Sequence, residues 1–219
     1  MTTVMKIDFV SDIACPWCAV GLGALEQALE ELQNEVKADI HFQPFELNPR
    51  MPPGGEDLVE HLGKKYGSTA DQQAQMYQNI KARGTEVGFA FHPTGRGRIF
   101  NTFDAHRLLH WAEVEGLTGD QHKLKKAFLE AYQGRGEVIE SHDVLLDIVK
   151  QIGMDVSAAK AVLESQTYAQ EVREKENFYT SAGIHSVPAV IINDKHLISG
   201  GQPAEVFANA LRQIAAAQV

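Results

Sequence analysis

The first thirty residues alternate apolar and polar positions in a way that predicts a strand followed by a helix. Residues 4–10 form a short apolar segment interrupted by Lys6 and Asp8, which is typical of a strand. Leucines then recur at intervals of three, four and three residues, the spacing of one face of an amphipathic helix. These are Leu22, Leu25, Leu29 and Leu32. The sequence Cys15-Pro16-Trp17-Cys18 therefore lies where a predicted strand passes into a helix N-terminus.

A second strand is predicted around Ile40 and Phe42, in which His41 and Gln43 alternate with the apolar positions and point outward. Because proline has no N–H group to give to a ladder, Pro44 indicates that this strand lies at a sheet edge or ends there. A Met-Pro-Pro-Gly-Gly run soon afterwards interrupts the pattern.

From residue 56 to residue 183 the spacing predicts one helix after another. Apolar residues recur three and four apart within residues 101–115, 124–131 and 144–152, and Gly153 marks one of the stops. Strand character returns later in the chain, followed by turn residues, a hairpin partner and a last helix. These later segments are residues 189–192, 193–195, 196–198 and the region after Gly200-Gly201.

This order of elements predicts an α/β fold whose outer parts form a βαβ–ββα unit. We expect residues 1–55 and 184–219 to make one domain, and residues 56–183 to form a large all-helical insertion within it.

Composition and charge exclude some classes of partner and predict the cellular location. The formal net charge of −9 argues against nucleic acid, whose affinity for proteins comes largely from Lys and Arg. No run of about 18 apolar residues predicts a membrane span. Lys6 and Asp8 interrupt the apolar start, so it does not resemble a secretory signal and we expect a cytoplasmic protein.

The two cysteines are the candidate chemistry. A disulfide scaffold needs more than one close pair, so Cys15 and Cys18 are more suited to redox chemistry than to stapling the fold. A helix N-terminus favours a thiolate, and in Cys-X-X-Cys motifs the thiol pKa falls to roughly 3.5–7. We therefore assign Cys15 as the nucleophile and Cys18 as the resolving thiol. Pro16 suits the first helical turn, where its missing N–H group is no loss.

Other readings of the cysteine pair stay open. Half of a zinc site would need further ligands at suitable spacing, which the sequence does not offer, and two incidental cysteines remain an alternative. Trp17 cannot stabilise a thiolate by charge, so it favours reduction or isomerisation over strong oxidation. Asp12 and Asp8 could relay a proton to Cys18, but we expect Asp12 to be a helix-capping or exposed acid.

Val187-Pro188 stands just before the apolar segment at residues 189–192, and an X–Pro bond is the one peptide bond where cis costs little. With the cysteine motif at a strand–helix junction, this resembles the thioredoxin superfamily. The helical insertion makes the chain similar to the DsbA family, and more narrowly to its FrnE-like branch or the DsbM-type cytosolic disulfide reductases. The resemblance covers essentially the whole chain. The further segments that carry it are residues 11–18, 45–49, 101–108 and 186–189.

The resemblance implies a thioredoxin-like fold in which Pro188 is cis and faces the cysteines, and in which the Val187 backbone pairs with a substrate peptide or glutathione. FrnE-type proteins can carry a further cysteine pair near the C-terminus, which this chain lacks. Related kappa-class glutathione transferases and hydroxychromene-carboxylate isomerases have Ser near the first cysteine position. They bind glutathione, and by analogy the candidate contacts are Asn48, Val187, Gly201 and Gln202.

Two further clusters suggest weaker hypotheses. His106 and His110 are four residues apart and could hold a metal, but a packed pair explains them better. Arg96 and Arg98 could meet an anionic substrate, but a solvated loop is the simpler interpretation.

The leading functional hypothesis is a cytosolic enzyme that reduces or isomerises disulfides of proteins or of glutathione. We expect it to be a monomer or a homodimer. It would have no tightly bound cofactor and would use glutathione as a co-substrate. A glutathione-dependent isomerase or transferase and a redox-sensing binding protein are the rivals.

Overall fold

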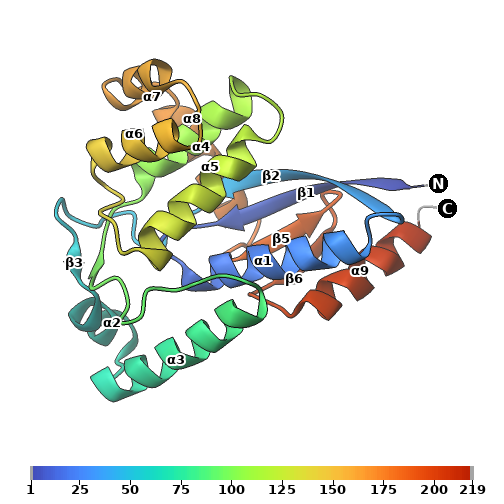
Figure 1. Ribbon diagram of the computed structural model, residues 1–219, viewed down its shortest axis with the longest axis horizontal. Helices are drawn as coiled ribbons and strands as arrows, with labels where there is room; N and C mark the ends of the chain where they lie inside the picture. The colour runs from blue at the N-terminus through green and yellow to red at the C-terminus, as the bar shows by residue number, and fades with distance from the viewer. Residues whose placement is uncertain (1, 218–219) are drawn as a thin grey trace.

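A mixed four-stranded sheet lies between helices, and further helices form a block at one of its ends (Figure 1). The computed structural model describes residues 2–217. Its elements in chain order are β1 (Thr3–Ser11), α1 (Pro16–Glu31), β2 (Val36–Pro44), β3 (Glu56–Asp57), α2 (Leu58–Tyr66), α3 (Ala70–Glu86), β4 (Arg98–Ile99), α4 (Phe103–Val114), α5 (Asp120–Leu129), a π-helical turn η1 (Glu130–Gly134), α6 (His142–Gln151), α7 (Val156–Leu163), α8 (Ala169–Ser181), β5 (Ala189–Ile192), β6 (His196–Ser199) and α9 (Ala204–Ala216).

The strand order in the sheet is β2-β1-β5-β6, with β1 and β2 parallel and the other pairs antiparallel. The predicted βαβ–ββα order is therefore confirmed. β2 begins at Val36, earlier than the apolar signal, and ends with Pro44 at the sheet edge. The outward orientation predicted for Gln43 is wrong, because this side chain is buried and donates to Asp8 Oδ1 at 2.8 Å.

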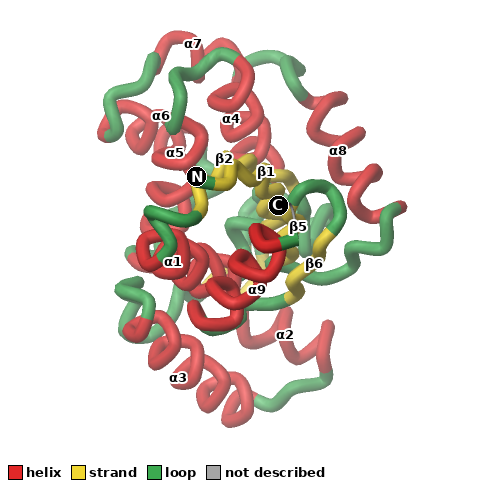
Figure 2. The backbone as a smooth tube through the Cα atoms, turned by 90° about the vertical axis from the view of Figure 1, so that its right-hand side faces the viewer, coloured by secondary structure: helices red, strands yellow, loops and turns green. Residues whose placement is uncertain are grey.

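The two faces of the sheet have different coverings (Figure 2). α1 and α9 pack together on one face, where Phe9, Leu25 and Phe207 belong to one buried apolar cluster. α8 lies over the other face, where Tyr179 packs with Val10. Neighbouring residues of β1 point to opposite faces, so Asp8 and Val10 belong to the α8 side and Phe9 to the α1 side.

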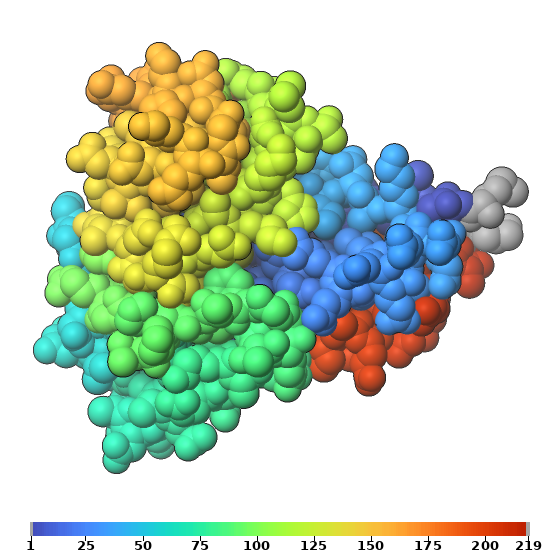
Figure 3. All heavy atoms as spheres, viewed as in Figure 1, coloured from blue at the N-terminus to red at the C-terminus, as the bar shows by residue number. Residues whose placement is uncertain are grey.

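The helices α4 to α7 enclose a second apolar cluster, and Figure 3 shows this part of the chain as a lobe coloured from light green to orange. Two residues of the loop between β1 and α1, Ile13 and Ala14, are buried in this cluster. The helical block is therefore packed directly against the loop that carries the cysteines.

Three details of residues 56–183 were not predicted by the helical spacing. β3 and β4 form a short antiparallel pair. α3 packs on α1, and α8 contacts β2. Both helices therefore cover the sheet domain, although they belong to residues 56–183, which were predicted to form a separate insertion.

Among residues 2–217, no helix is both long and apolar enough to cross a bilayer.

Candidate redox site

Cys15 is the N-cap residue of α1, with an extended backbone, and Pro16 occupies the first helical position. The fixed φ of proline suits that position, which explains why the helix begins there. The first-turn N–H groups of a helix have no partner inside it, and they give its N-terminus a partial positive charge. The Cys15 sulfur therefore sits where the local backbone stabilises a thiolate. Cys18 lies almost one turn further along, and its N–H donates to the Cys15 carbonyl oxygen at 3.1 Å.

The two thiols are free and have opposite pKa shifts. A hydrogen bond from the Cys18 thiol lowers the pKa of Cys15 and outweighs burial, which acts the other way. Burial raises the pKa of Cys18 well above its ordinary value, and the neighbouring Cys15 adds to the increase. Cys15 is 4% exposed and Cys18 fully buried. The asymmetry has the direction that a nucleophile and a resolving thiol require.

The Val187–Pro188 peptide bond is cis, and the segment faces the cysteines. Cys15 Sγ lies 3.4 Å from the carbonyl oxygen of Val187, a residue 172 positions away in the chain. Pro188 is buried and its carbonyl oxygen accepts from Gly200 N at 2.8 Å. Gly21 of α1 permits this approach, because a Cβ added there would lie 2.9 Å from Pro188 Cγ.

Asp12 is fully buried, so our expectation of a helix-capping or exposed acid is wrong. Its carboxylate accepts from the backbone N–H of Leu47 at 2.7 Å, the N–H of Ala14 at 3.0 Å and the Thr102 hydroxyl at 2.8 Å. His106 Nε2 approaches it to 3.5 Å. Burial alone would raise the pKa of Asp12, but the His106 ring and the backbone N–H groups of Leu47 and Ala14 lower it. Asp12 thus ties β1, the segment after β2 and the start of α4 together directly behind the cysteines.

The loop that carries Arg96 and Arg98 contacts the same region. Our expectation that this loop is solvated is therefore wrong for Arg96. Its guanidinium donates to Gln133 Oε1 at 2.7 Å and lies over the Tyr132 ring, 4.7 Å from the centroid. Gln133 Nε2 in turn donates to the carbonyl oxygen of Ile13 at 2.7 Å. A chain of two hydrogen bonds therefore connects Arg96 to the cysteine loop. Arg98 donates to the backbone of residues 54 and 55.

The structure brings only some of the predicted glutathione contacts to the cysteines. Gly201 packs on Trp17, since a Cβ added there would lie 3.0 Å from the Trp17 carbonyl oxygen. The Gln202 side chain donates to Ser199 O at 2.9 Å. Asn48 Oδ1 accepts from His61 at 2.9 Å and Lys65 at 2.8 Å, both on α2.

Lys125 was missed by sequence reasoning. This α5 residue is fully buried, and Nζ has no hydrogen-bond partner among residues 2–217. The sequence feature that could have revealed this burial is the position of Lys125 on the apolar face of α5, four residues before Leu129.

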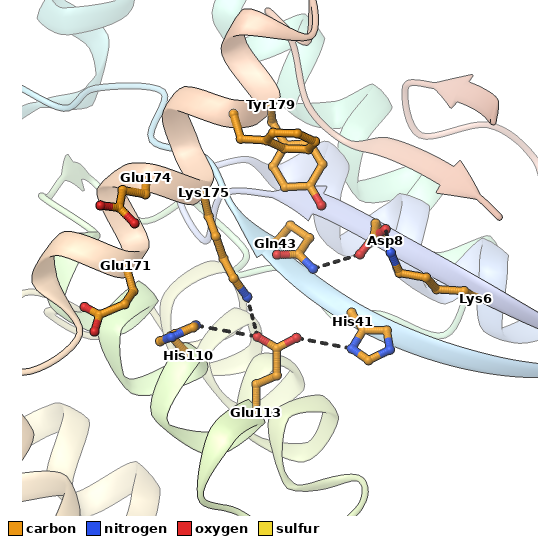
Figure 4. A pocket seen from close by; sticks show the side chains of 11 residues that line it. Lys6, Asp8, His41, Gln43, His110, Glu113, Glu171, Glu174, Lys175 and Tyr179 are labelled. Atoms are coloured by element: carbon orange, nitrogen blue, oxygen red, sulfur yellow. Dashed lines mark hydrogen bonds and ion pairs between the residues drawn. The ribbon is translucent and has the colours of Figure 1, made fainter. Parts of the chain in front are cut away.

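A polar cavity of about 620 Å³ lies on the α8 face of the sheet, on the side opposite to α1 (Figure 4). At its centre Glu113 is 2.6 Å from Lys175, 3.2 Å from His41 and 3.5 Å from His110. His110 therefore faces this cavity whereas His106 faces Asp12, so the two histidines do not converge on one metal. Burial would raise the pKa of Glu113, but His110, Lys175 and His41 lower it to about 2.

A thioredoxin-type sheet with a Cys-X-X-Cys pair at the N-terminus of α1, a cis-proline loop beside it and a helical insertion between β2 and β5 is typical of DsbA-like thiol oxidoreductases. The DSBA-like thioredoxin domain family matches residues 6–212, and the chain belongs to this family. The DsbA resemblance and the fold class are thereby confirmed.

Similarity to individual proteins extends over the full length of the chain. YwbO of Bacillus subtilis (strain 168) is 30% identical over 217 residues, which cover 96% of each protein. A crystal structure of "probable DsbA oxidoreductase SCO1869" from Streptomyces coelicolor is 31% identical, with a TM-score of 0.88, over 98% of this chain and 91% of that one. The cytosolic disulfide reductase DsbM from Pseudomonas aeruginosa with GSH shares the fold at 15% identity, with a TM-score of 0.62, over 95% and 98%.

Proposed function

We propose that the protein is a cytoplasmic thiol–disulfide oxidoreductase that reduces or isomerises disulfides of proteins or of glutathione, using Cys15 and Cys18 as its redox pair. The observation that carries the proposal is the position of the Cys15 sulfur. It lies at the N-terminus of α1, 3.4 Å from the Val187 carbonyl oxygen, with Cys18 almost one turn behind it. A disulfide presented at this loop would meet the thiol of lower pKa first.

The reaction proceeds in two exchanges. The Cys15 thiolate attacks one sulfur of the substrate disulfide, forming a mixed disulfide and releasing the other sulfur as a thiolate. The Cys18 thiolate then attacks the Cys15 sulfur, which closes the Cys15–Cys18 disulfide and frees the second substrate thiolate. Two electrons have passed from the protein to the substrate. Two glutathione thiols return them, giving one glutathione disulfide.

The substrate contacts follow from the loop beside Cys15. A substrate segment in extended conformation would pair with the Val187 backbone, as β-strand addition pairs a peptide with an exposed edge. Trp17 and Gly201 form the adjoining wall. The DsbM neighbour was solved with GSH, which supports glutathione as the co-substrate. Asn48 and Gln202 are weaker candidates, since both side chains already have partners within the protein.

The direction of electron flow is proposed from Trp17, which carries no charge to stabilise the Cys15 thiolate. A less stabilised thiolate corresponds to a less oxidising disulfide. A reductase or isomerase is therefore favoured over a strong oxidant, and disulfide-containing proteins or glutathione are the proposed partners. The rival glutathione-dependent isomerase needs no second thiol, so it leaves the buried Cys18 without a role.

The test measures the equilibrium of the Cys15–Cys18 pair against glutathione buffers, together with the reduction of insulin disulfides. We expect a potential closer to the about −270 mV of thioredoxin than to the about −120 mV of DsbA. Cys15→Ser abolishes insulin reduction, and Cys18→Ser accumulates the mixed disulfide with glutathione. A wild type without reductase or exchange activity, or a Cys15→Ser variant that keeps it, rules the proposal out.

A further inference from the structure

Lys125 is the one lysine among residues 2–217 whose side chain is fully buried. Its ammonium nitrogen is shielded from solvent and makes no hydrogen bond to the described residues. A buried charge without a partner is unfavourable, because nothing replaces the water it has lost. Burial favours the neutral amine, so the charged form of Lys125 needs a counter-charge, either permanent or transient.

The neighbours of Lys125 on α5 pack into both apolar clusters that flank the cysteine motif. Leu129, one turn after Lys125, is buried in the same apolar cluster as Cys18. Phe128, on the same helix, packs in the cluster that contains Ile13 and Ala14. The α5 segment that carries Lys125 therefore lies between the cluster that contains Cys18 and the cluster that contains the loop before α1.

The ionisable groups that act on Lys125 are Cys18, Asp12 and Cys15. Burial lowers the pKa of Lys125, and negative charge on each of these groups opposes the decrease. Asp12 already has backbone N–H groups and the Thr102 hydroxyl as donors. Of the two thiols, Cys18 has the larger electrostatic effect on Lys125, and Lys125 lowers the pKa of Cys18 in return.

We propose that Lys125 is a positioning residue for the resolving step, and that its ammonium group supplies the counter-charge when Cys18 becomes a thiolate. The inference rests on the proposed function. While Cys15 is a thiolate, the Cys18 thiol donates a hydrogen bond to it and needs no charge. Once Cys15 is held in a mixed disulfide, the Cys18 proton leaves to solvent and the negative charge moves to a buried sulfur. Lys125 then stabilises that charge, and Cys18 attacks Cys15 Sγ while the bond from Cys15 to the substrate sulfur breaks.

The test separates the two exchanges by rapid mixing of the reduced protein with dithiobis-nitrobenzoate, a disulfide that releases a coloured thiolate at each step. The first phase reports the attack by Cys15 and the second the attack by Cys18. In Lys125→Met we expect the first phase to stay within about twofold of wild type. The second slows roughly tenfold or more, and the pH at which its rate is half-maximal rises, since a nearby opposite charge shifts a pKa by about one unit or more.

The matched control is Lys126→Met, which removes the exposed neighbouring lysine and its ion pair with Glu26. It leaves both phases and the pH midpoint unchanged. Lys125→Gln is the second variant, in case methionine prevents folding, and circular dichroism verifies the fold of each.

A second phase in a folded Lys125 variant with the rate and pH midpoint of wild type overturns the inference alone. A wild type that shows no reaction of Cys15 overturns the proposed function, and the inference falls with it.

Discussion

The two faces of the sheet place charged side chains in opposite situations. On the α8 face, Glu113 lies between Lys175, His41 and His110, and every one of these partners is present permanently (Figure 4). On the α1 face, Lys125 is fully buried and has no hydrogen-bond partner in the described part of the chain. Both groups have shifted pKa values, yet for different reasons.

The two groups differ in what their shifted pKa values describe. The carboxylate of Glu113 is stabilised by side chains that belong to the folded protein, so its low pKa describes a stable folded state. Burial is the largest influence on Lys125, so its shift describes an environment that lacks a permanent counter-charge. Perturbed pKa values cluster at reactive sites, but structural ion-pair networks perturb pKa values as well. This difference supports our proposal that the reaction takes place at the cysteines, and we expect the α8 cavity to be structural.

The largest effect on stability is expected for Asp12→Asn, which tests the buried charge beside the cysteines. Asp12 is buried and accepts from Leu47, Ala14 and Thr102, and the single oxygen of an asparagine amide cannot replace both carboxylate oxygens. We expect the free energy of unfolding to fall by about 2–3 kcal/mol, measured by urea denaturation near neutral pH. Asp147→Asn on the exposed side of α6 changes it by less than about 0.5 kcal/mol.

The same variant has a defined pH dependence. The folded pKa of Asp12 lies below its ordinary value of 3.8, so its carboxylate contributes stability above that value. The contribution disappears as the pH falls through the lowered folded pKa. The difference between Asp12→Asn and wild type therefore shrinks in strong acid. Because the Asp12 charge raises the pKa of Cys15, the variant also lowers that thiol pKa, which a thiolate absorbance titration measures. An unchanged unfolding curve at neutral pH contradicts this view of Asp12.

Gly21→Ala is next, and it tests whether the close contact between α1 and the Pro188 loop matters for activity. The new Cβ would lie 2.9 Å from Pro188 Cγ and 3.4 Å from Gly201 Cα, so the loop beside Cys15 has to move. We expect a loss of about 1–2 kcal/mol in the free energy of unfolding and a roughly tenfold drop in insulin reduction.

Gly63→Ala in α2 provides the control, since its new Cβ finds only Ser68 O at 3.5 Å, an ordinary contact. There the higher helix propensity of alanine stabilises the protein by up to about 1 kcal/mol. If the two substitutions change insulin reduction equally, the contact between α1 and Pro188 does not matter for activity.

Glu113→Gln gives the smallest expected effect and can break the comparison. We expect the free energy of unfolding to fall by about 1–2 kcal/mol near neutral pH, with thiol exchange within twofold of wild type. The pKa of Glu113 falls from 4.5 to about 2 on folding, so its contribution is complete above about pH 4.5 and is lost as the pH falls toward 2. A folded Glu113→Gln protein with impaired thiol exchange shows that the α8 face takes part in the reaction.

The local features of the site could be predicted from the sequence because each depends on neighbouring residues. The start of α1 behind Cys15 follows from Pro16 and the leucine spacing. The turn between β5 and β6 follows from Asn193 and Asp194, which both adopt positive φ. The environments of Gln43 and Asp12 could not be predicted, because partners from other segments bury them.

The burial of Lys125 could not be predicted from the sequence. Its spacing on α5 matches the apolar positions, but a lysine in such a pattern is ordinarily assigned to a solvated edge of the helix. Only the packing of α5 against both the cysteine loop and α1 excludes water from its nitrogen.

Sequence patterns miss the β3–β4 pair, but they predict the order β1-α1-β2 and β5-β6-α9, the placement of two thiols at a helix N-terminus, and the Val187-Pro188 segment before a core strand. Each is set by residues a few positions apart. Only packing between distant segments brings Cys15 to Val187, buries Asp12 among its donors, and leaves Lys125 buried without a hydrogen-bond partner in the described part of the chain. These features depend on packing because the energy of a charge or a thiol is set by water exclusion and by neighbours from distant parts of the chain.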